Sequence, residues 1–413
     1  YQGPRWRMDF LKSVFPGEKA SLDRYWKDYL RFTSLMTFAR RMERSTGLAA
    51  RYWQARLFLK LVPFLTRKDW SAQQLMDSYF SSRQLQCVFI SILADFFTPP
   101  SQFPGLGVFT LNPEASFDKR IPKTLAPNTE QLYHYSVLGG ISKLVDALVD
   151  KIEGEGGRVL TNTAVTQIMI ENNRVTGVQI EDGTTTPADI VIASGGAKET
   201  FFKLVGEAKL PPDFVQSVQQ TPLMDSVFMV HLGLDLDPSP HVHGTVTYYY
   251  GTYDIEGSVN EARQGSYHEG EKGFVVHVPT LHTPDMAPAG HHAMTIYTIC
   301  PDCLREGAPF EGGWEAHKED FADKLVAYAE KYIPGLREHT QTRAILTPED
   351  FRTRTHTDHH AFGGLAPIMN TPRVPHQTPV QGLWFVGAQS ESGGGINAVM
   401  PAAYKVAQRV LAE

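Results

Sequence analysis

The sequence predicts an α/β (α+β) fold of two domains, and three stretches carry this prediction. Residues 141–192 read as a helix, a strand, a hairpin and a further strand. Residues 223–298 alternate as several strands with no helix between them, which is typical of a mixed or antiparallel sheet. Residues 382–411 read as a buried strand, three glycines and a helix with an apolar face. A chain of 413 residues is also too long for one ordinary core.

The first part of the chain, up to Tyr135, is predicted to be helical and then rich in loops. Apolar residues at helical spacing cover 11–65 and 71–97, before prolines and glycines interrupt the pattern. Residues 51–70 combine aromatic and aliphatic side chains with five basic residues, and no acidic residue precedes Asp69. Such a segment is typical of a helix in the lipid headgroup layer, and also of a core-packed helix with a solvated basic edge. It is therefore a candidate for membrane surface contact.

The middle of the chain has the clearest local pattern. Strict helical spacing covers 141–152, and glycines end the helix. A strand is predicted at 158–160, a hairpin turns at Asn172-Asn173, and an apolar strand at 190–192 leads into Gly195-Gly196. Residues without side chains at the carboxyl end of a strand let another group approach the backbone closely.

The predicted sheet region is followed by a helix and a histidine-rich loop. Its strands are expected at 227–230, 245–250, 274–277 and 293–297. A helix is predicted at 314–332, and histidines then gather at 356–360. The small residues of 361–364 indicate a tight passage close to a functional site.

The last stretch combines a short strand with two glycine-containing turns. The strand at 383–386 ends in Gly387-Ala388, and Gly393-Gly394-Gly395 open the final helix. Uncovered N–H groups and the positive end of the helix dipole suit an anionic or carbonyl-bearing ligand. The run also fits G-x-G-x-x-A, but the chain stops before the βαβ unit of that fingerprint could close. Tight strand-to-helix packing is the alternative explanation of these glycines.

These two glycine passages, in this order, resemble the flavin-binding segments of the phytoene desaturase-like FAD oxidoreductases. That group contains carotenoid desaturases, carotenoid isomerases and retinol saturases. The resemblance runs from Gly139-Gly140 through 188–206, and again over 382–397. Glu391 stands where the family usually has proline, and Ala398 where glycine often follows. The resemblance implies a two-domain FAD-dependent oxidoreductase of the amine oxidase/phytoene desaturase type.

The resemblance also implies which residues contact FAD. Those expected beside the cofactor are Val165, Gly195, Gly196, Gly387, Ala388, Gly394, Gly395, Ile396 and Asn397. The backbone of Val165 would line the adenine, and that of Gly395, Ile396 and Asn397 would lie near the flavin carbonyl oxygens. The candidates for a catalytic acid or base, chosen by position, are Glu391, Asp358, His359 and His360, although polar loop residues are usually only solvated.

The beginning of the sequence departs from the family. Members open with a strand, a G-x-G-x-x-G turn and a helix that hold the FAD adenosine and pyrophosphate, and no such opening is present here. The sequence begins at Tyr1, without an initiator methionine. We therefore expect that the chain starts inside a longer protein or has lost upstream residues, and that FAD binding depends on them. The expected regions are 1–135 (helical, substrate- or membrane-facing), 136–205 (part of the FAD domain), 206–345 (substrate domain) and 346–413 (the rest of the FAD domain).

Composition argues against several other classes of protein. A net charge of -6 argues against a nucleic-acid binder. Three cysteines cannot form a disulfide framework, and no apolar run approaches the length of about 18 that spans a bilayer. We therefore expect a cytoplasmic protein, or one at a membrane periphery. Cys300-x-x-Cys303 has no second pair for a zinc site, and the 15 histidines show no ligand spacing, so no metal is expected.

The leading functional hypothesis is hydride transfer between FAD and a long apolar substrate of carotenoid, isoprenoid or retinoid type. The sequence leaves desaturation, saturation and isomerisation open. A flavin amine oxidase is the first alternative, and a flavin-free lipid-binding or assembly subunit is the second. The oligomeric state is open as well.

Overall fold

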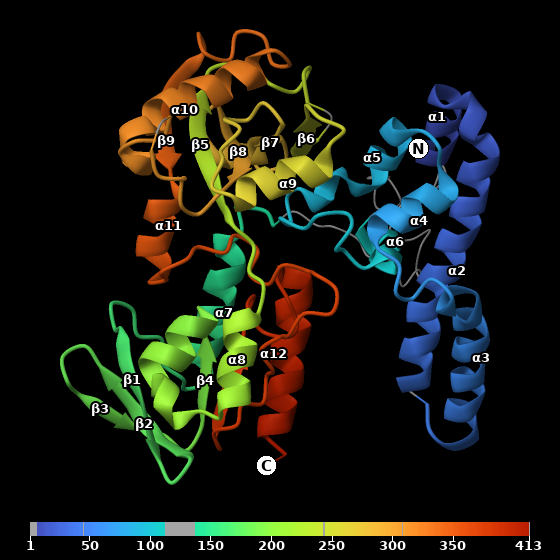
Figure 1. The fold of residues 1–413 in the computed structure, drawn as a ribbon. Coiled ribbons are helices and arrows are strands. Elements are labelled where there is room, and N and C mark those ends of the chain that lie inside the picture. Colours follow the sequence, from blue (N-terminus) through green and yellow to red (C-terminus); the bar gives the residue numbers. More distant parts are fainter. Residues whose placement is uncertain (1–5, 44, 112–136, 243, 308, 413) are drawn as a thin grey trace. The chain divides into compact units, whose positions relative to one another are not determined.

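The computed structural model describes residues 6–43, 45–111, 137–242, 244–307 and 309–412. The chain divides into two units, the first of which comprises Tyr1–Tyr135 and Tyr253–Gly257 (Figure 1). The second comprises Ser136–Thr252 and Ser258–Glu413. Most of the loop-rich passage predicted before Tyr135 lies outside the described residues. The predicted boundaries at 205 and 345 stay predictions.

The first unit is helical in its described part. Its helices are α1 (Trp6–Val14), α2 (Lys19–Glu43), α3 (Gly47–Leu65), α4 (Ala72–Tyr79), α5 (Arg83–Ile90) and α6 (Val108–Leu111). The core is aromatic, with the Tyr25 ring 4.5 Å from Phe89 and 5.4 Å from Phe109 between centroids. The predicted helix over 71–97 is broken between α4 and α5, because the Ser82 side chain accepts a hydrogen bond from Leu85 N–H and starts a new helix.

One part of the second unit contains two small sheets. The first sheet has the order β1-β2-β3 (Val165–Glu171, Arg174–Ile180, Thr185–Pro187) and the second pairs β4 (Val191–Ser194) with β10 (Leu383–Val386) in parallel. The helical elements of this part are α7 (Ser142–Gly154), η5 (Glu199–Gly206), α8 (Pro212–Gln220) and α12 (Ile396–Val410). The β1–β2 hairpin turns at Asn172 and Asn173, both with positive φ, as predicted. The strand predicted at 158–160 is absent, and Leu160 there is exposed.

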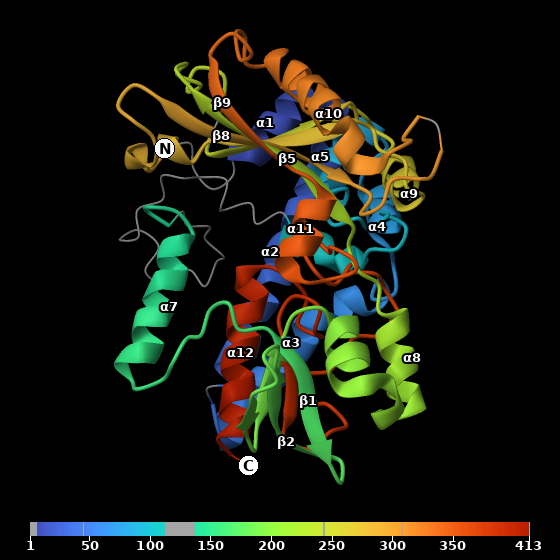
Figure 2. The same ribbon diagram turned by 90° about the vertical axis from the view of Figure 1, so that its left-hand side faces the viewer.

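The other part of the second unit is a five-stranded sheet of order β6-β7-β8-β5-β9, in which every recorded pairing is antiparallel. Its strands are β5 (Ser226–Leu234), β6 (Val246–Tyr250), β7 (Gly273–His277), β8 (His292–Cys300) and β9 (Thr340–Leu346). The accompanying helices are α9 (Ile255–Arg263), α10 (Gly313–Glu330) and α11 (Pro348–Thr355). Helix α10 covers one face of this sheet (Figures 1 and 2). On that face Phe228 packs against Trp314 and Phe321.

Candidate functional site

The two predicted glycine turns lie at the same edge of one sheet. Strands β4 and β10 are parallel neighbours with Ser194 opposite Val386, so their carboxyl ends point the same way. Gly195 follows directly after β4, and Gly387 after β10. The side chain of Gln389 joins the two turns, because its Oε1 accepts a hydrogen bond of 2.8 Å from the Ala197 N–H.

A third segment, the loop 357–364, reaches the second of these turns. The N–H of Leu365 donates to the carbonyl of Ala388 at 2.9 Å. A Cβ added at Gly364 would collide with the Ala388 carbonyl, and one added at Gly394 would collide with the Gly363 carbonyl. Backbone therefore meets backbone here, and glycine is needed for the close approach.

The other end of the loop 357–364 reaches the first turn. The N–H of Asp358 donates to Glu199 Oε1 at 2.9 Å, at the start of η5. A Cβ added at Gly196 would lie 3.0 Å from the Thr357 methyl group. Three segments, 195–197, 357–364 and 387–397, thus come together, and we call them the glycine cradle. The sequence predicted two of the three directly and placed the third nearby.

The start of α12 offers free backbone donors to the glycine cradle. Gly395 is its N-cap residue with φ of 89°, and no side chain caps the helix start. Ile396 and Asn397 at the first turn are exposed. An uncapped helix of 15 residues presents N–H groups and a partial positive charge at this end. Such a start can bind carbonyl oxygens or an anion.

Gly195 differs from the other cradle glycines in one respect. A Cβ added there would meet no protein atom within 4 Å, and its φ is not in the left-handed region. The protein itself therefore does not require glycine at this position. A ligand that approaches the backbone closely would supply the reason.

Two of the four candidate catalytic residues, Glu391 and Asp358, make contacts within the protein: one binds a backbone N–H and the other forms an ion pair at the surface. The carboxylate of Glu391 accepts a hydrogen bond of 3.0 Å from the His376 N–H. His376 in turn contacts the Phe385 carbonyl through Nδ1 at 2.9 Å. Asp358 forms an exposed ion pair of 2.6 Å with Lys203. Their catalytic assignment stays a prediction.

The two candidate histidines are engaged in contacts that hold the loop. His360 is buried, its Nδ1 lies 2.6 Å from Ser226 Oγ, and its ring stacks on Phe351 at 4.6 Å between centroids. Burial lowers the pKa of His360 to about 4, so its ring is neutral at pH 7. His359 Nε2 donates to the Met224 carbonyl at 2.9 Å. One nitrogen of each ring is thus engaged within the protein, and the catalytic assignment of both histidines stays a prediction.

With the geometry defined, comparison with known proteins assigns the chain to a family. The family model described as flavin containing amine oxidoreductase matches residues 7–411. The chain belongs to this family. Its fold class, predicted above as that of a two-domain FAD-dependent oxidoreductase, is thereby confirmed.

Individual relatives and solved structures agree with this assignment. A lycopene-forming phytoene desaturase from a Paracoccus species is 28% identical over 280 residues, which are 67% of this chain and 54% of the relative. Pyridine nucleotide-disulfide oxidoreductase domain-containing protein 2 of Mus musculus is 26% identical over 283 residues, 63% of this chain and 48% of the relative. The chain spans about half the length of these curated relatives. The crystal structure of an oxidoreductase from Methanosarcina mazei has a similar fold, with TM-score 0.55, 19% identity, and 86% of this chain and 72% of that chain covered.

The glycine cradle fits a flavin, the cofactor that gives the family its name. The fit rests on the uncapped start of α12 and on Gly195, where an added Cβ would meet no protein atom. Residues 394–397 would face the flavin carbonyl oxygens, and residues 195–196 would pass beside the cofactor. Val165 lies apart from the cradle, in another sheet, where it pairs with Ile180.

A face of the five-stranded sheet adjoins the glycine cradle. On the side away from α10, one row of residues crosses all five strands: Tyr248, Val275, Tyr297, Met229 and Leu346. The ring of Phe362, which belongs to the loop 357–364, lies 5.7 Å from that of Tyr297 between centroids. We call this side the open sheet face, in which Tyr248 is 41% exposed, Val275 is buried and the other three residues of the row are half-buried. It is apolar and aromatic, and Phe362 makes it continuous with the cradle.

The next row of the open sheet face contains two histidines. Its residues are Val246, His277, Thr295, His231 and Ala344. Burial lowers the pKa of His277, and burial together with the nearby Arg354 charge lowers the pKa of His231. His231 Nδ1 lies 2.8 Å from Thr295 Oγ1. Both histidines are therefore neutral at pH 7, and neither row contains a carboxylate.

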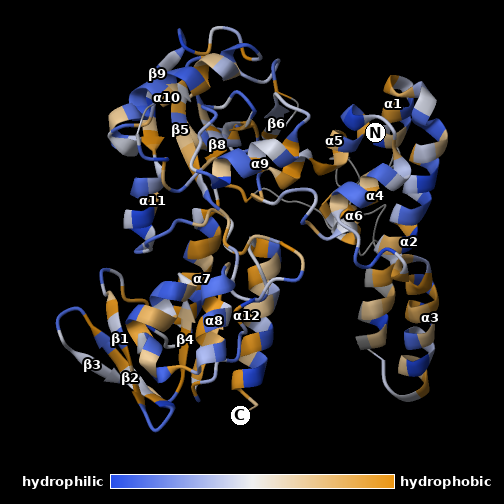
Figure 3. Cartoon of the chain, in the orientation of Figure 1, coloured by the Kyte–Doolittle hydropathy of each residue, from blue (hydrophilic) through white to orange (hydrophobic). Residues whose placement is uncertain are grey.

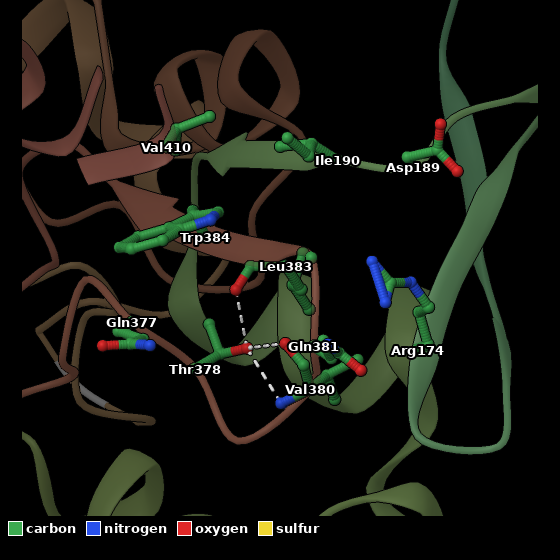
Figure 4. Close-up of a pocket in the computed structure, with 11 residues that line it drawn as sticks. Arg174, Asp189, Ile190, Gln377, Thr378, Val380, Gln381, Leu383, Trp384 and Val410 are labelled. Carbon is green, nitrogen blue, oxygen red and sulfur yellow. Dashed lines mark hydrogen bonds between the residues drawn. The ribbon is translucent and has the colours of Figure 1, made fainter. Parts of the chain in front are cut away.

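A separate pocket of about 510 Å³ lies at the opposite edge of the β4–β10 sheet (Figure 4). Arg174, Asp189 and Ile190 line it, next to the amino ends of both strands. Figure 4 shows Thr378 in this pocket, where it donates to the Leu383 carbonyl at 2.8 Å. Because the glycine turns follow the carboxyl ends of the strands, this pocket is not the predicted site.

The sequence did not single out Asp302, which holds the histidine-containing loop. Its carboxylate is 4% exposed and pairs with Arg352 at 2.9 Å. Its Oδ1 accepts the His360 N–H at 3.0 Å, and His359 Nδ1 lies 3.5 Å from the Oδ2 that pairs with Arg352. Asp302 lies between Cys300 and Cys303, and the sequence analysis considered only the two thiols of this loop.

Metal or redox chemistry at that loop receives no support from the structure. Burial raises the pKa of the Cys300 thiol well above its usual value, and raises that of Cys303 as well. A raised pKa disfavours the reactive thiolate. Over the described residues, no group of three or more His, Cys, Asp or Glu side chains is placed to hold a metal ion.

Proposed function

We propose that this chain acts as an FAD-dependent oxidoreductase that transfers a hydride between a carbon–carbon unit of a long apolar substrate and the flavin. The substrate class would be carotenoid, isoprenoid or retinoid-like. The observation that carries the proposal is the glycine cradle, in which three segments distant in sequence expose backbone at one sheet edge. The flavin, when bound, supplies the hydride acceptor or donor.

The residues of the chain have correspondingly simple tasks. The N–H groups at the start of α12 would stabilise the flavin carbonyl oxygens and the negative charge of a reduced ring. Gly195 would let the ring approach the backbone, and Gly394 lets the loop 357–364 pack against the start of α12. The open sheet face would exclude water and hold the substrate beside the cradle.

The open sheet face supports an apolar substrate over an amine. A carboxylate is one common partner of an ammonium group, whereas the aromatic rings of Tyr297 and Phe362 could contact either an ammonium group or an apolar chain. The two rows across this face hold no carboxylate, and both of their histidines are neutral at pH 7. A phytoene desaturase among the relatives supports the same choice. The family description names amine oxidoreductases, so a flavin amine oxidase is the alternative to test.

Flavin binding can be tested by a substitution that the protein alone tolerates. Gly195→Ala adds a Cβ that meets no protein atom within 4 Å, so the melting temperature should stay unchanged. If the flavin lies against this backbone, the added methyl group should weaken flavin affinity by roughly five- to 150-fold, since overpacking costs about 1–3 kcal/mol. Gly154→Ala, also in open space, is the matched control and should leave flavin affinity unchanged.

The measurement is the visible absorption of bound flavin during titration with FAD, followed by turnover assays. Oxidation of a carotenoid in liposomes and of a polyamine in buffer separates the two substrate classes. Because FAD binding is expected to depend on residues upstream of Tyr1, the titration uses a protein that carries a dinucleotide-binding segment before Tyr1. No flavin absorption by that protein at saturating FAD would refute the proposal and favour a flavin-free lipid-binding subunit. Amine oxidation without carotenoid turnover would refute the apolar substrate alone.

A further inference from the structure

Helix α3 of the first unit has apolar residues on two opposite faces. One face packs into the core of its own unit through Phe64, with Leu57 and Leu61 half-buried beside it. The opposite face carries Leu48 and Leu59, which are 84% and 67% exposed. A helix that is apolar all round is normally buried on all sides. The exposed face of α3 therefore calls for an explanation.

The exposed residues form a continuous line along the helix. Leu48, Tyr52, Leu59 and Val62 follow one another at intervals of four, seven and three residues, which places them on one face. Each is at least 43% exposed. We call this line the outer stripe of α3. Figure 3 shows the hydrophobic residues that run along this helix.

The charges near the outer stripe are almost all positive. Between Arg31 and Leu65 the sequence has seven basic residues and a single acidic one, although the whole chain has a net charge of -6. Helix α3 itself contains Arg51, Arg56 and Lys60 and no acidic residue. The stripe is thus bordered only by positive charge, which complements an anionic surface.

Two of these basic side chains are held in place by aromatic rings of the α2–α3 hairpin. The guanidinium of Arg56 lies 5.6 Å from the Phe38 ring centroid and 5.7 Å from that of Tyr52. The Lys60 ammonium lies 5.8 Å from the same Phe38 ring. Cation–π contacts of this kind keep the charges beside the stripe.

We propose that the outer stripe of α3 docks on the surface of an anionic lipid bilayer. The apolar side chains would enter the interface between headgroups and acyl chains, and the flanking basic residues would contact anionic headgroups. Among the described residues no helix is both long and apolar enough to cross a bilayer. The helix therefore lies in the plane of the interface. This inference does not depend on flavin binding or on turnover.

The test is co-sedimentation of the purified full chain with phosphatidylcholine vesicles, with and without phosphatidylglycerol. The chain should bind vesicles that contain phosphatidylglycerol, and added salt should weaken this binding because it screens the charges. Leu59→Glu/Val62→Glu should weaken it by roughly tenfold or more, since burial of one such side chain is worth about 1.5–3 kcal/mol. Arg51→Gln should weaken it about fivefold, at about 1 kcal/mol per basic residue.

The matched control is Phe10→Glu/Val14→Glu, an exposed apolar pair on α1 of the same unit. It should leave vesicle binding unchanged. Equal binding to both kinds of vesicle, or equal loss in the two double variants, would overturn the proposal. A dimer in light scattering that Leu59→Glu/Val62→Glu dissociates would also overturn it and make the stripe a contact between copies. Should that variant not fold, the salt titration and Arg51→Gln still decide the question.

Discussion

Replacement of Asp302 tests whether a buried ion pair holds the loop 357–364 of the glycine cradle. Asp302→Ala removes the partner of Arg352 at 2.9 Å and the acceptor of the His360 N–H at 3.0 Å. Loss of one partner of a buried ion pair costs about 3–5 kcal/mol, and a buried N–H without acceptor costs about 1–3 kcal/mol. Because the two losses overlap, we expect the free energy of unfolding to fall by about 3–5 kcal/mol in total.

Asp358→Ala is the matched control, because Asp358 lies in the same loop but its carboxylate is exposed. The side chains of the Lys203–Asp358 pair are 55% and 76% exposed, so this substitution should cost less than about 1 kcal/mol. Urea denaturation followed by circular dichroism measures both variants. A difference below about 1 kcal/mol between them would refute the argument from burial.

A double-mutant cycle separates the ion pair from other effects at this position. Arg352→Met alone leaves the Asp302 carboxylate buried without its guanidinium partner. The double variant Asp302→Asn/Arg352→Met should therefore be more stable than the sum of the single changes predicts, by about 1–3 kcal/mol. Additive changes would mean that the two side chains act independently.

Three further substitutions test other parts of the site. Gly394→Ala should lower stability by about 1–3 kcal/mol in thermal melting, because its Cβ meets the Gly363 carbonyl, which is backbone and cannot rotate away. Stability should also fall as the pH drops from about 6.5 toward 4, because the unfolded chain takes up a proton at His360 that the folded chain, with a pKa of about 4, does not. His360→Gln should therefore lose less stability between pH 7 and pH 5 than the unsubstituted chain, and an equal loss would contradict this. Tyr297→Gln, on the open sheet face, should raise KM for a carotenoid roughly tenfold while kcat stays nearly unchanged, whereas an unchanged KM would remove this face from substrate binding.

Strands β5 to β8 of the large sheet and the β1–β2 hairpin were predictable because their signals are local, whereas β9 (Thr340–Leu346) was not predicted. Alternation of apolar and polar residues predicted β6 and β7 to within one residue of their bounds, whereas β5 and β8 extend to Leu234 and Cys300, beyond their predicted ends at 230 and 297. Asn172 and Asn173 tolerate positive φ, which identified the hairpin turn. The prediction of a strand at 158–160 was wrong. A short extended segment forms a strand only when its backbone pairs with a neighbouring strand. Among the described residues, Leu160 is exposed and lies in no sheet.

The glycine cradle was predictable only in its backbone. Glycine at a strand end is a signal that can be seen in one dimension, and Gly195, Gly387 and Gly394 did converge on one sheet edge. The contacts of polar side chains were not visible in this way. Asp302 and His360 are 58 residues apart in sequence, and only the fold brings them within 3.0 Å.

The polar loop residues that the sequence offered as catalytic candidates help to hold the glycine cradle together, and their catalytic assignment stays a prediction. Glu391 binds the backbone of His376, and His359 and His360 bind groups on β5 or directly before it. These side chains help to hold the segments in place, because each of them forms a hydrogen bond to another part of the protein. A flavin reaction needs mainly an accurately placed ring and a dry substrate surface, since the cofactor carries the hydride. Polar residues near such a site are thus expected to position backbone, and their replacement should change flavin affinity and stability before it changes the chemical step.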